Sequence, residues 1–238
     1  MPSLKNWDKK NWLSSKKYIQ SFNSFILKQK KLNKNSRILD IGCGRGKIMD
    51  NLSSQLKLIN KPVGLDIENH KDKSKKIIFK KIDALTFIVK TNTTFDLILI
   101  KQTIHFLKIS QILKLLSICK NKLNPRGKII ILSLEPDNNK IPTFSLMNKK
   151  LKNSFKRDRK IFDLITKNFK NIIIKSFLFK VKILKKEYIK MIKNRYISTL
   201  LNFNNKQILD GINEINLKFK RELIFSDRLI CLIIRKEL

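Results

Sequence analysis

The 238-residue sequence is poor in glycine, cysteine, histidine and acidic residues. Its three cysteines are far apart and odd in number, which argues against a disulfide framework and a zinc site and favours a reducing compartment. No apolar run approaches the roughly 18 residues that a membrane-spanning helix needs, and residues 1–8 lack the apolar core of a secretory signal. We therefore expect a cytoplasmic protein without a membrane segment, and a single domain over residues 1–238.

Acidic residues are scarce beside basic ones. The 18 Asp and Glu are outnumbered by 53 Lys and Arg, a formal net charge of +35. A charge of this size attracts polyanions such as nucleic acid at low salt. Lysines outnumber arginines 44 to 9 and run along the whole chain, whereas nucleic-acid sites favour the bidentate contacts of arginine. Two interpretations stay open: an evolved basic surface, or a drift in composition toward lysine.

The scarcity of glycine makes one cluster stand out. Three of the six glycines, Gly42, Gly44 and Gly46, follow the apolar run 38–41, and a helical pattern begins at Lys47. This order predicts a buried strand, a tight turn and the start of a helix. Glycine is needed in such a turn for positive φ or for the close approach of a ligand. The amino end of a helix offers free N–H groups, so a nucleotide-like cofactor is expected here.

Strand and helix patterns alternate along the chain, which predicts an α/β fold. Continuously apolar runs such as 97–100 are typical of buried parallel strands. A helix at 14–32, capped by Ser14 or Ser15, precedes the first strand. Strands are predicted near 37–41, 62–67, 77–82, 95–101 and 128–134, and helices near 47–58 and 108–122. There follow a segment at 135–157 that is loop-rich at first and then helical, a helix near 158–169, a β-like stretch at 171–184, two helices within 185–218 and a final strand at 229–234.

Two acidic residues end predicted strands. Asp66 follows Gly46 by 20 residues, and a carboxylate at that place can accept both ribose hydroxyls of a bound nucleoside. The alternative for Asp66 is an acidic helix cap. Asp83 ends the strand at 77–82, where an acid is also common in ordinary loops.

The glycine spacing D-x-G-x-G-x-G does not fit the dinucleotide pattern G-x-G-x-x-G. It resembles motif I of the class I S-adenosylmethionine-dependent methyltransferases. Four more matches follow in the family's order: VGLDIE at 63–68, IIFKKIDA at 77–84, FDLILIKQ at 95–102 and LNPRGK at 123–128. The resemblance covers residues 36–135 and extends to the small-molecule type, the type 11/25 domains and the trans-aconitate methyltransferase-like proteins. Arg126 stands where the family usually has glycine, and we expect Gly127 to make the turn instead.

The resemblance implies a Rossmann-like, doubly wound seven-stranded sheet, mostly parallel with an antiparallel last strand. It also implies a lid helix at 7–31, a cofactor-binding half at 36–135, and a helical insertion at 185–218 that shapes the acceptor pocket. The implied cofactor is S-adenosyl-L-methionine. Its implied binding residues are Asp40, Gly42, Cys43 and Gly44 at the methionine moiety, Gly46 in the turn, Asp66 at the ribose, Ile67, Asp83 and Ala84 at the adenine, and the Lys101 carbonyl at the amino group.

Methyl transfer requires an aligned nucleophile, exclusion of water and, for some acceptors, a base. His105 is the candidate base, because it follows the fourth strand and histidine titrates near neutrality; a packing or surface histidine is the alternative. Tyr18 is a second catalytic candidate, or it packs within the lid. Arg195, Tyr196 and Gln102 are candidate acceptor-binding residues, with a helix-surface charge as the alternative for Arg195. The other histidine, His70, is expected in a solvated loop.

These observations predict a methyltransferase that acts on a small molecule, at oxygen or nitrogen rather than carbon. The chain lacks the Asn/Asp-Pro-Pro-aromatic tetrapeptide of many nucleic-acid and protein amino-group methyltransferases, since residues 101–104 read KQTI. It also shows no appended RNA-binding module. Nucleic acid is therefore a possible acceptor but not the favoured one. The alternatives are an RNA methyltransferase that uses the basic charge and a binding module without catalysis; no oligomeric state is predicted.

Overall fold

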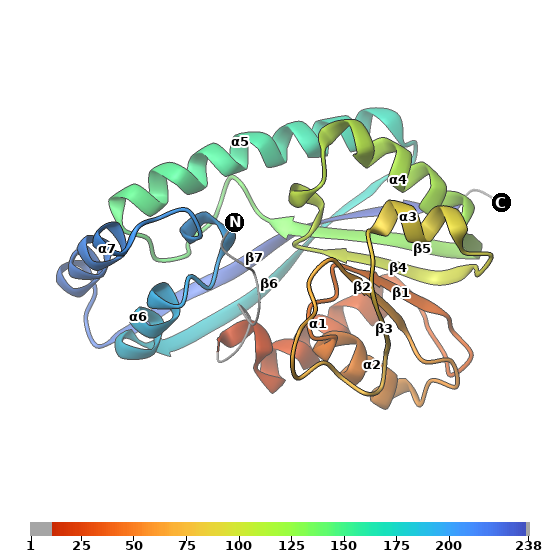
Figure 1. Ribbon diagram of the computed structural model, residues 1–238, viewed down its shortest axis with the longest axis horizontal. Coiled ribbons are helices and arrows are strands. Elements are labelled where there is room, and N and C mark those ends of the chain that lie inside the picture. The colour runs from red at the N-terminus through yellow and green to blue at the C-terminus, as the bar shows by residue number, and fades with distance from the viewer. Residues whose placement is uncertain (1–10, 237–238) are drawn as a thin grey trace.

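The computed structural model describes residues 11–236, in which one sheet lies between two layers of helices (Figure 1). The sheet has the order β3-β2-β1-β4-β5-β7-β6. Its strands are β1 Ile38–Ile41, β2 Val63–Asp66, β3 Ile78–Lys81, β4 Phe95–Lys101, β5 Leu123–Leu134, β6 Ile173–Leu184 and β7 Glu222–Arg235. Strand β7 runs antiparallel to both of its neighbours, and the other pairs are parallel. The predicted seven-stranded, doubly wound sheet with a reversed last strand is confirmed.

Helices cover both faces of the sheet. One face carries α1 Lys16–Gln29 and α2 Lys47–Leu56, and the other carries α3 Ala84–Lys90, α4 Ile109–Asn121 and α5 Ser145–Asn168 (Figure 1). Between β6 and β7 lie α6 Lys185–Lys193 and α7 Asn205–Lys218, which confirms a helical insertion before the last strand. Three short 3-10 helices are η1 Trp12–Ser14, η2 Ile104–Phe106 and η3 Ser198–Leu200. Among the described residues, no helix combines the length and apolarity needed to cross a membrane.

Strand β4 shows how the two faces are built. Leu97 and Leu99 pack in the core beneath α1 and α2, whereas Ile98 and Ile100 pack in the core beneath α3, α4 and α5. Successive side chains of a strand point to opposite faces, so a central strand covered on both sides must be apolar throughout. The apolar run at 97–100 therefore is the buried parallel strand that its composition predicts.

Two helices differ from the prediction. The helical end of the segment at 135–157 and the helix expected near 158–169 form one continuous 24-residue helix, α5, because buried residues recur at helical spacing from Met147 through Leu151 and Phe155 to Phe162. The short α3 was not predicted. Its amino end is capped by Asp83, whose carboxylate accepts the Thr86 N–H at 2.9 Å.

The last strand is much longer than the predicted 229–234. Strand β7 begins at Glu222 and pairs with β6 along 173–184, so the two strands form a ribbon that continues past the end of β5 (Figure 1). Leu223, Phe225 and Asp227 alternate with more exposed residues on this ribbon and are buried. The buried side of the ribbon faces α1 and the insertion, where Tyr18 and Phe22 pack against Phe177.

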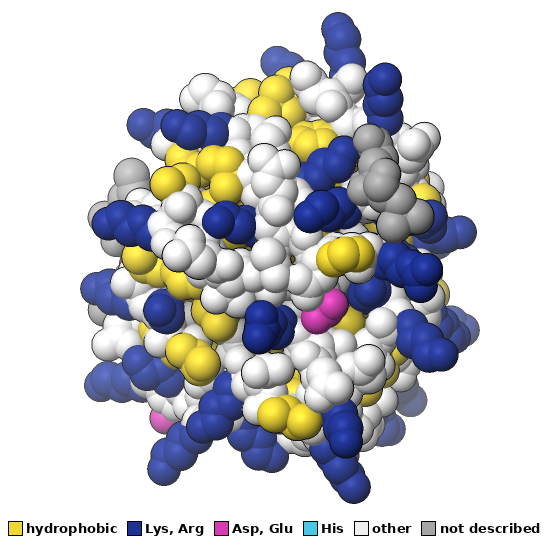
Figure 2. Space-filling model, turned by 90° about the vertical axis from the view of Figure 1, so that its right-hand side faces the viewer, with side chains coloured by type: hydrophobic (Ala, Val, Ile, Leu, Met, Phe, Trp, Pro, Cys, Tyr) yellow, Lys and Arg dark blue, Asp and Glu magenta, His cyan; other side chains and the backbone are white. Residues whose placement is uncertain are grey.

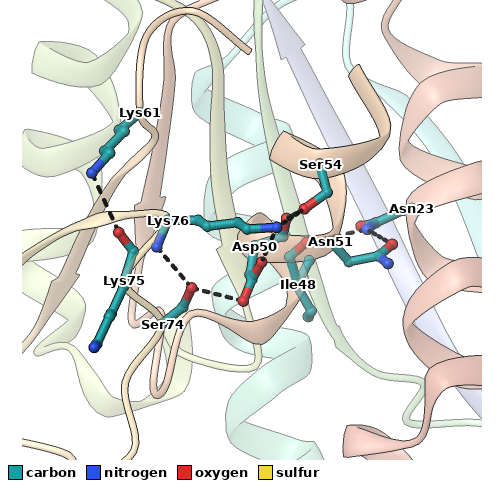
Figure 3. Close-up of polar contacts among 9 residues, drawn as sticks. All are labelled: Asn23, Ile48, Asp50, Asn51, Ser54, Lys61, Ser74, Lys75 and Lys76. Atoms are coloured by element: carbon teal, nitrogen blue, oxygen red, sulfur yellow. Dashed lines mark hydrogen bonds and ion pairs between the residues drawn. The ribbon is translucent and has the colours of Figure 1, made fainter. Parts of the chain in front are cut away.

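The predicted lid helix is present as α1. Ser15 caps it by accepting the Tyr18 N–H at 3.2 Å, as one of the two expected caps. Asn23 fastens it to α2 by donating to the Ile48 carbonyl at 3.1 Å and to the Asn51 side chain at 2.9 Å (Figure 3). The start of the lid, including Trp7 and Asp8, lies outside the described residues.

The irregular first part of β5, where a turn was expected before the strand, corrects one expectation. Register with β4 jumps from Leu123 to Lys128, so residues 124–127 loop out of the pairing. The residue with positive φ in this loop is Arg126, at +62°, and not Gly127. Gly127 is needed for space instead, because a Cβ there would lie 2.8 Å from the Asn124 carbonyl oxygen and 2.9 Å from that of Phe95.

This geometry predicts that Arg126→Gly stabilises the protein. Left-handed backbone costs a non-glycine residue about 1–2 kcal/mol, of which the greater freedom of glycine in the unfolded chain cancels part. We expect the free energy of unfolding to rise by about 0.5–1 kcal/mol, measured by urea denaturation. Arg126→Ala is the control, which removes the same side chain but keeps the unfavourable φ. An Arg126→Gly protein less stable than Arg126→Ala would contradict the prediction.

Candidate functional site

The glycine turn between β1 and α2 is open to a ligand at one position. All three glycines have positive φ. A Cβ on Gly42 would lie 2.0 Å from the Thr103 hydroxyl oxygen, so packing alone excludes a side chain there. A Cβ on Gly44 would meet nothing within 4 Å. Gly44 therefore borders free space beside the start of α2, and this is the room that a nucleotide-like cofactor needs.

Asp66 lies at the carboxyl end of β2 and binds the glycine turn. Its Oδ2 accepts the Gly44 N–H at 2.9 Å, and its Oδ1 accepts the Glu68 N–H at 3.0 Å. The His70 Nε2 lies 3.5 Å from Oδ2. Burial acts to raise the pKa of Asp66, but His70 and the two N–H donors outweigh it, so the pKa lies below its ordinary value. The carboxylate is therefore ionised and oriented at neutral pH.

The sequence predicted His70 in a solvated loop, and this prediction is wrong. His70 is 4 % exposed and packs against Asp66, and its Nδ1 has no hydrogen-bond partner within the described part of the chain. Sequence reasoning missed it because the flanking residues, ENHKDK, are polar. The i,i+4 spacing from Asp66 was the one available signal.

The loop that carries His70 is fastened at its far end. The Ser74 hydroxyl donates to Asp50 of α2 at 2.7 Å and accepts the Lys76 N–H at 3.1 Å (Figure 3). The Ser74 N–H donates to the Arg45 carbonyl in the glycine turn at 3.0 Å. These bonds hold residues 67–77 against the turn, so the position of His70 beside Asp66 is supported from both sides.

Asp40, in β1, is buried with 4 % of its surface exposed. Burial raises its pKa to about 7; the positive charge of Lys101 acts to lower the pKa, and the negative charge of Asp66 acts to raise it. A group that binds here and carries positive charge would favour the ionised form. This suits the predicted position of Asp40 at the charged methionine moiety.

Lys101 connects the end of β4 with the lid. Its carbonyl oxygen accepts the Thr103 hydroxyl at 3.0 Å, and its ammonium donates to the Gln102 side-chain oxygen at 2.7 Å. The same ammonium lies 5.4 Å and 5.5 Å from the ring centres of Tyr18 and Phe22 in α1. Helix α1 therefore crosses the carboxyl end of β4, as a lid over the site requires.

The residues predicted at the adenine lie along the ends of β2 and β3. Ile67 follows Asp66 and is 63 % exposed, which leaves an apolar surface for a flat ring. Asp83 is exposed, and its Oδ1 caps α3, whereas Ala84 is buried. Cys43 is half-buried, with its thiol 3.6 Å from the Gly44 carbonyl oxygen, and burial raises its pKa. The roles of these residues toward a cofactor stay predictions.

A small cavity of about 20 Å³ lies beside the end of β4. It brings together two of the predicted acceptor residues, Gln102 and Tyr196, although 94 positions separate them in the chain. Its lining is Trp12, Leu13, Gln102, Leu134, Ile141, Tyr196, Ile197 and Asp227. The walls are thus largely apolar, with one carboxylate.

Asp227 is the residue of this cavity that sequence reasoning missed as a functional candidate. It is 1 % exposed, and the Trp12 Nε1–H donates to its Oδ2 at 3.0 Å. Burial raises its pKa, while the contacts from Trp12 and the charge of Lys101 act in the opposite direction. The available signal was an acid within the otherwise apolar pattern of residues 223–234.

Tyr18 and Tyr196 are both buried near this carboxylate. Burial, the charge of Asp227 and a hydrogen bond with that carboxylate raise the pKa of Tyr18. The Tyr196 hydroxyl shares a hydrogen bond of 2.9 Å with the Tyr188 hydroxyl, which donates to the Pro142 carbonyl. Tyr18 is therefore directed toward Asp227, and Tyr196 is held by its neighbour.

Three of the predicted catalytic and acceptor residues, Tyr18, His105 and Arg195, do not line this cavity. His105, in η2, has its ring centre 4.1 Å from that of Phe106 in a tilted arrangement, and burial and the charge of Arg157 lower its pKa to about 4. The expectation that it titrates near neutrality is wrong. Arg195 donates to the Phe203 carbonyl and the Asn205 side chain, both at 3.0 Å, and so fastens the insertion.

A larger hollow, of about 410 Å³, lies at the opposite end of the sheet. It is formed by the segment that precedes β1 and by the amino ends of β4 and β5, including Asn35, Asp96 and Asn124. Parallel α/β sheets bind ligands at the carboxyl ends of their strands. The glycine turn, Asp66 and the cavity at Asp227 all lie at the carboxyl ends, so we place the functional site there.

Comparison with known proteins identifies the class. Residues 15–168 match the family model described as a methyltransferase domain. The match covers more than half of the chain, and the chain belongs to this methyltransferase family. Membership confirms the predicted enzyme class and its methyl donor, S-adenosylmethionine. The narrower trans-aconitate methyltransferase-like type stays a prediction.

Solved structures show the same fold at low identity, and no curated protein matches the sequence. An S-adenosylmethionine-dependent methyltransferase from Archaeoglobus fulgidus is 20 % identical, with a TM-score of 0.53 over 92 % of this chain and 94 % of the other. A plantazolicin methyltransferase in complex with SAH is 18 % identical, with a TM-score of 0.54 over 98 % and 88 %. A putative methyltransferase from an antibiotic biosynthesis pathway of Anabaena variabilis is 15 % identical, with a TM-score of 0.63 over 88 % and 95 %.

The buried Asp40 predicts pH-dependent cofactor binding. With a pKa of about 7, about a tenth of the carboxyl groups are ionised at pH 6 and about nine tenths at pH 8. If Asp40 receives the amino group of S-adenosylhomocysteine, binding favours the ionised form and releases a proton at low pH. We expect roughly tenfold tighter binding at pH 8 than at pH 6, measured by calorimetric titration. Asp40→Asn should remove this dependence, and equal affinities of the wild type at both pH values would contradict the assignment.

His70 is predicted to orient Asp66 for the ribose. His70→Gln should weaken S-adenosylhomocysteine binding about fivefold, because a contact to the carboxylate is worth about 1 kcal/mol, while the melting temperature changes little. The chain offers a matched control, because its only other histidine, His105, does not contact Asp66. His105→Gln should leave the dissociation constant unchanged. A His70→Gln protein that binds as well as the wild type would show that His70 only packs.

Proposed function

We propose that the enzyme transfers the methyl group of S-adenosylmethionine to a small-molecule acceptor held beside Asp227. The observation that supports this most is the small cavity beside the end of β4. Its walls come from η1, the end of β4, the insertion and β7. At about 20 Å³ it has room for about one water molecule, so the lid must open to admit any acceptor. A cavity of this size suits a small-molecule acceptor.

The residues at the glycine turn fit the cofactor. Gly44 leaves the space for it, Asp66 presents an oriented carboxylate to the ribose hydroxyls, and Asp40 faces the charged methionine end. Ile67, Asp83 and Ala84 are proposed at the adenine, and the Lys101 carbonyl at the amino group. The cofactor supplies a methyl group already activated on a positively charged sulfur. The protein is left with alignment, exclusion of water and removal of a proton.

The chain's own residues can perform these tasks. The rings of Trp12, Tyr18 and Phe22 are buried over the end of β4 and exclude water. Gln102 and Tyr196 line the acceptor cavity and are proposed to orient the acceptor. Asp227 can accept a proton from an oxygen or nitrogen nucleophile, and the Tyr18 hydroxyl is buried beside it. His105 is not retained as the base, because its low pKa and its place outside the cavity do not support that role.

The net positive charge of the protein does not by itself indicate that the acceptor is a nucleic acid. Figure 2 shows lysine and arginine spread around the whole face drawn, with neutral and apolar side chains between them. A nucleic-acid site gathers its positive charge into a stripe or patch. The dispersed pattern supports compositional drift, and a cytoplasmic location is proposed on the three free thiols.

Calorimetric titration with S-adenosylhomocysteine tests the cofactor site. We expect micromolar binding by the wild type in about 0.15 M salt, which screens the surface charge beyond about 8 Å. Asp66→Ala should weaken binding by about 100-fold, because hydrogen bonds to a charged group are worth about 1.5–3 kcal/mol each. Asp163→Ala is the control, since Asp163 is exposed on α5.

The acceptor class is tested with labelled S-adenosylmethionine. Transfer to a pool of small nucleophiles supports the proposal. Transfer to total RNA with none to the small molecules would contradict it. A folded wild type that does not bind S-adenosylhomocysteine would contradict the cofactor assignment itself.

A further inference from the structure

Asp227 joins the lid, here η1 and α1, to the last strand of the sheet. The Trp12 Nε1–H donates to its Oδ2 at 3.0 Å, and the Tyr18 hydroxyl forms a hydrogen bond with the same carboxyl group. Trp12 lies in η1 and Tyr18 in the first turn of α1, whereas Asp227 lies on β7, 215 positions after Trp12. Two donors of the lid therefore meet on one residue of the sheet.

These hydrogen bonds lie in the interior of the protein. Trp12, Tyr18 and Asp227 are all buried. A hydrogen bond is stronger in such surroundings than in water, and a buried group that loses its partner is costly. The charge of Lys101 acts on the same carboxyl group, and its ammonium lies 5.4 Å from the ring centre of Tyr18. Asp227 is therefore a fixed point to which the lid is bound.

The other contacts of the lid with this part of the sheet are apolar. The ring of Tyr18 lies edge to face with those of Phe177 and Phe179, at 5.6 Å and 5.1 Å, and Phe22 lies 5.3 Å from Phe177. Apolar contact is non-directional, so it holds the helix against β6 without fixing its position along the strand. The directional hydrogen bonds to Asp227 select one position.

In that position the acceptor cavity is too small for an acceptor. Trp12 and Asp227 both line the cavity, whose volume of about 20 Å³ suits about one water molecule. The Trp12 ring also lies edge to face with Tyr196 of the insertion, at 5.3 Å. A larger molecule requires part of this wall to move. The hydrogen bond between Trp12 and Asp227 joins two parts of the wall and must break if η1 moves away.

We propose that Asp227 is a positioning residue that holds the lid closed through Trp12 and Tyr18, and that the site exchanges its ligands when these two hydrogen bonds break. This inference rests on the proposed function for the ligands that the lid covers, and it adds the group that controls opening. Holding the lid requires only hydrogen-bonding atoms at position 227, whereas the proton transfer proposed above requires the negative charge. The two roles can therefore be separated by substitution.

Hydrogen exchange of the protein without cofactor measures the opening of the lid directly. Trp12→Phe keeps a ring and removes the N–H donor. A helix of 14 residues is marginal once it leaves the sheet, so we expect the amides of α1 to exchange about tenfold faster. The amides of α4 should exchange as in the wild type. A role of Trp12 in general stability would instead accelerate both helices.

The control for this substitution is Tyr188→Phe. Tyr188 stacks on Trp12 with ring centres 6.4 Å apart, and its buried hydroxyl bonds to Tyr196 and Pro142. It removes a buried hydrogen-bonding group beside the same ring but none of the two bonds to Asp227. We expect exchange in α1 at the wild-type rate.

Release of labelled S-adenosylhomocysteine into an excess of the unlabelled compound tests position 227. Trp12→Phe and Asp227→Leu should each release it about tenfold faster than the wild type. Asp227→Asn should stay within about threefold, because the amide offers an oxygen to Trp12 and an N–H to the Tyr18 oxygen. The double variant Trp12→Phe/Asp227→Leu should be no faster than Asp227→Leu, since both changes remove the same bond.

The outcomes separate this inference from the proposed function. Wild-type exchange of α1 in Trp12→Phe overturns the inference, and so does equal acceleration of α1 and α4. Release from Asp227→Asn as fast as from Asp227→Leu overturns the role of hydrogen bonding at position 227. If Asp227→Leu does not fold, exchange in Trp12→Phe and Tyr18→Phe decides, because each removes one donor. A folded wild type that does not bind S-adenosylhomocysteine overturns the proposed function, while the exchange of α1 still decides the role of Asp227.

Discussion

The bond between the glycine turn and Asp66 is the constraint on which the rest of the site depends. The Gly44 N–H donates to the carboxylate at 2.9 Å, while the N–H groups of Gly42 and Cys43 both donate to the Leu65 carbonyl, at 2.8 Å and 2.9 Å. These bonds join the end of β1 to the end of β2. They hold the turn in a conformation with positive φ values, after which α2 begins. In this conformation there is free space beside Gly44. The same bonds also set the carboxylate at the edge of that space, so the shape of the site and its charge are determined together.

Negative charge is concentrated where the chemistry requires it. The protein carries a formal net charge of +35, yet Asp40, Asp66 and Asp227 lie at the carboxyl edge of the sheet with little exposure. The charge of Lys101 acts on both Asp40 and Asp227, so one cation links the cofactor side with the acceptor side. The low dielectric around a buried acid strengthens its interactions with nearby groups, so these interactions dominate over those with the basic surface. The acceptor chemistry proposed here follows from these local interactions and not from the net charge.

Most of the fold could be predicted because its signals are local. Apolar runs and helical spacing placed β1 through β4 and α2 and α4 within about two residues, since each depends on the periodicity of neighbouring side chains. The errors occurred where packing decided the boundaries. The prolines and asparagines at 136–142 made the start of α5 difficult to predict. The first half of β7 was not predicted, because the pattern at 222–228 is mixed and only pairing with β6 makes that segment a strand. Arg126 takes the left-handed conformation, whereas Gly127 is needed because a side chain there has no room.

The sequence by itself determined the class of the protein: glycines at D-x-G-x-G-x-G, an acid at the end of the next strand, and the alternation of strands and helices are local patterns with a physical cause. Only the tertiary structure decided which side chains share a site. It placed His70 against Asp66, brought Gln102, Tyr196 and Asp227 to one cavity, and left His105 and Arg195 outside it. Burial and charge depend on neighbours far away in the chain. Asp227 is therefore an unremarkable acid in the sequence and a buried carboxyl group of the cavity at the end of β4 in the fold.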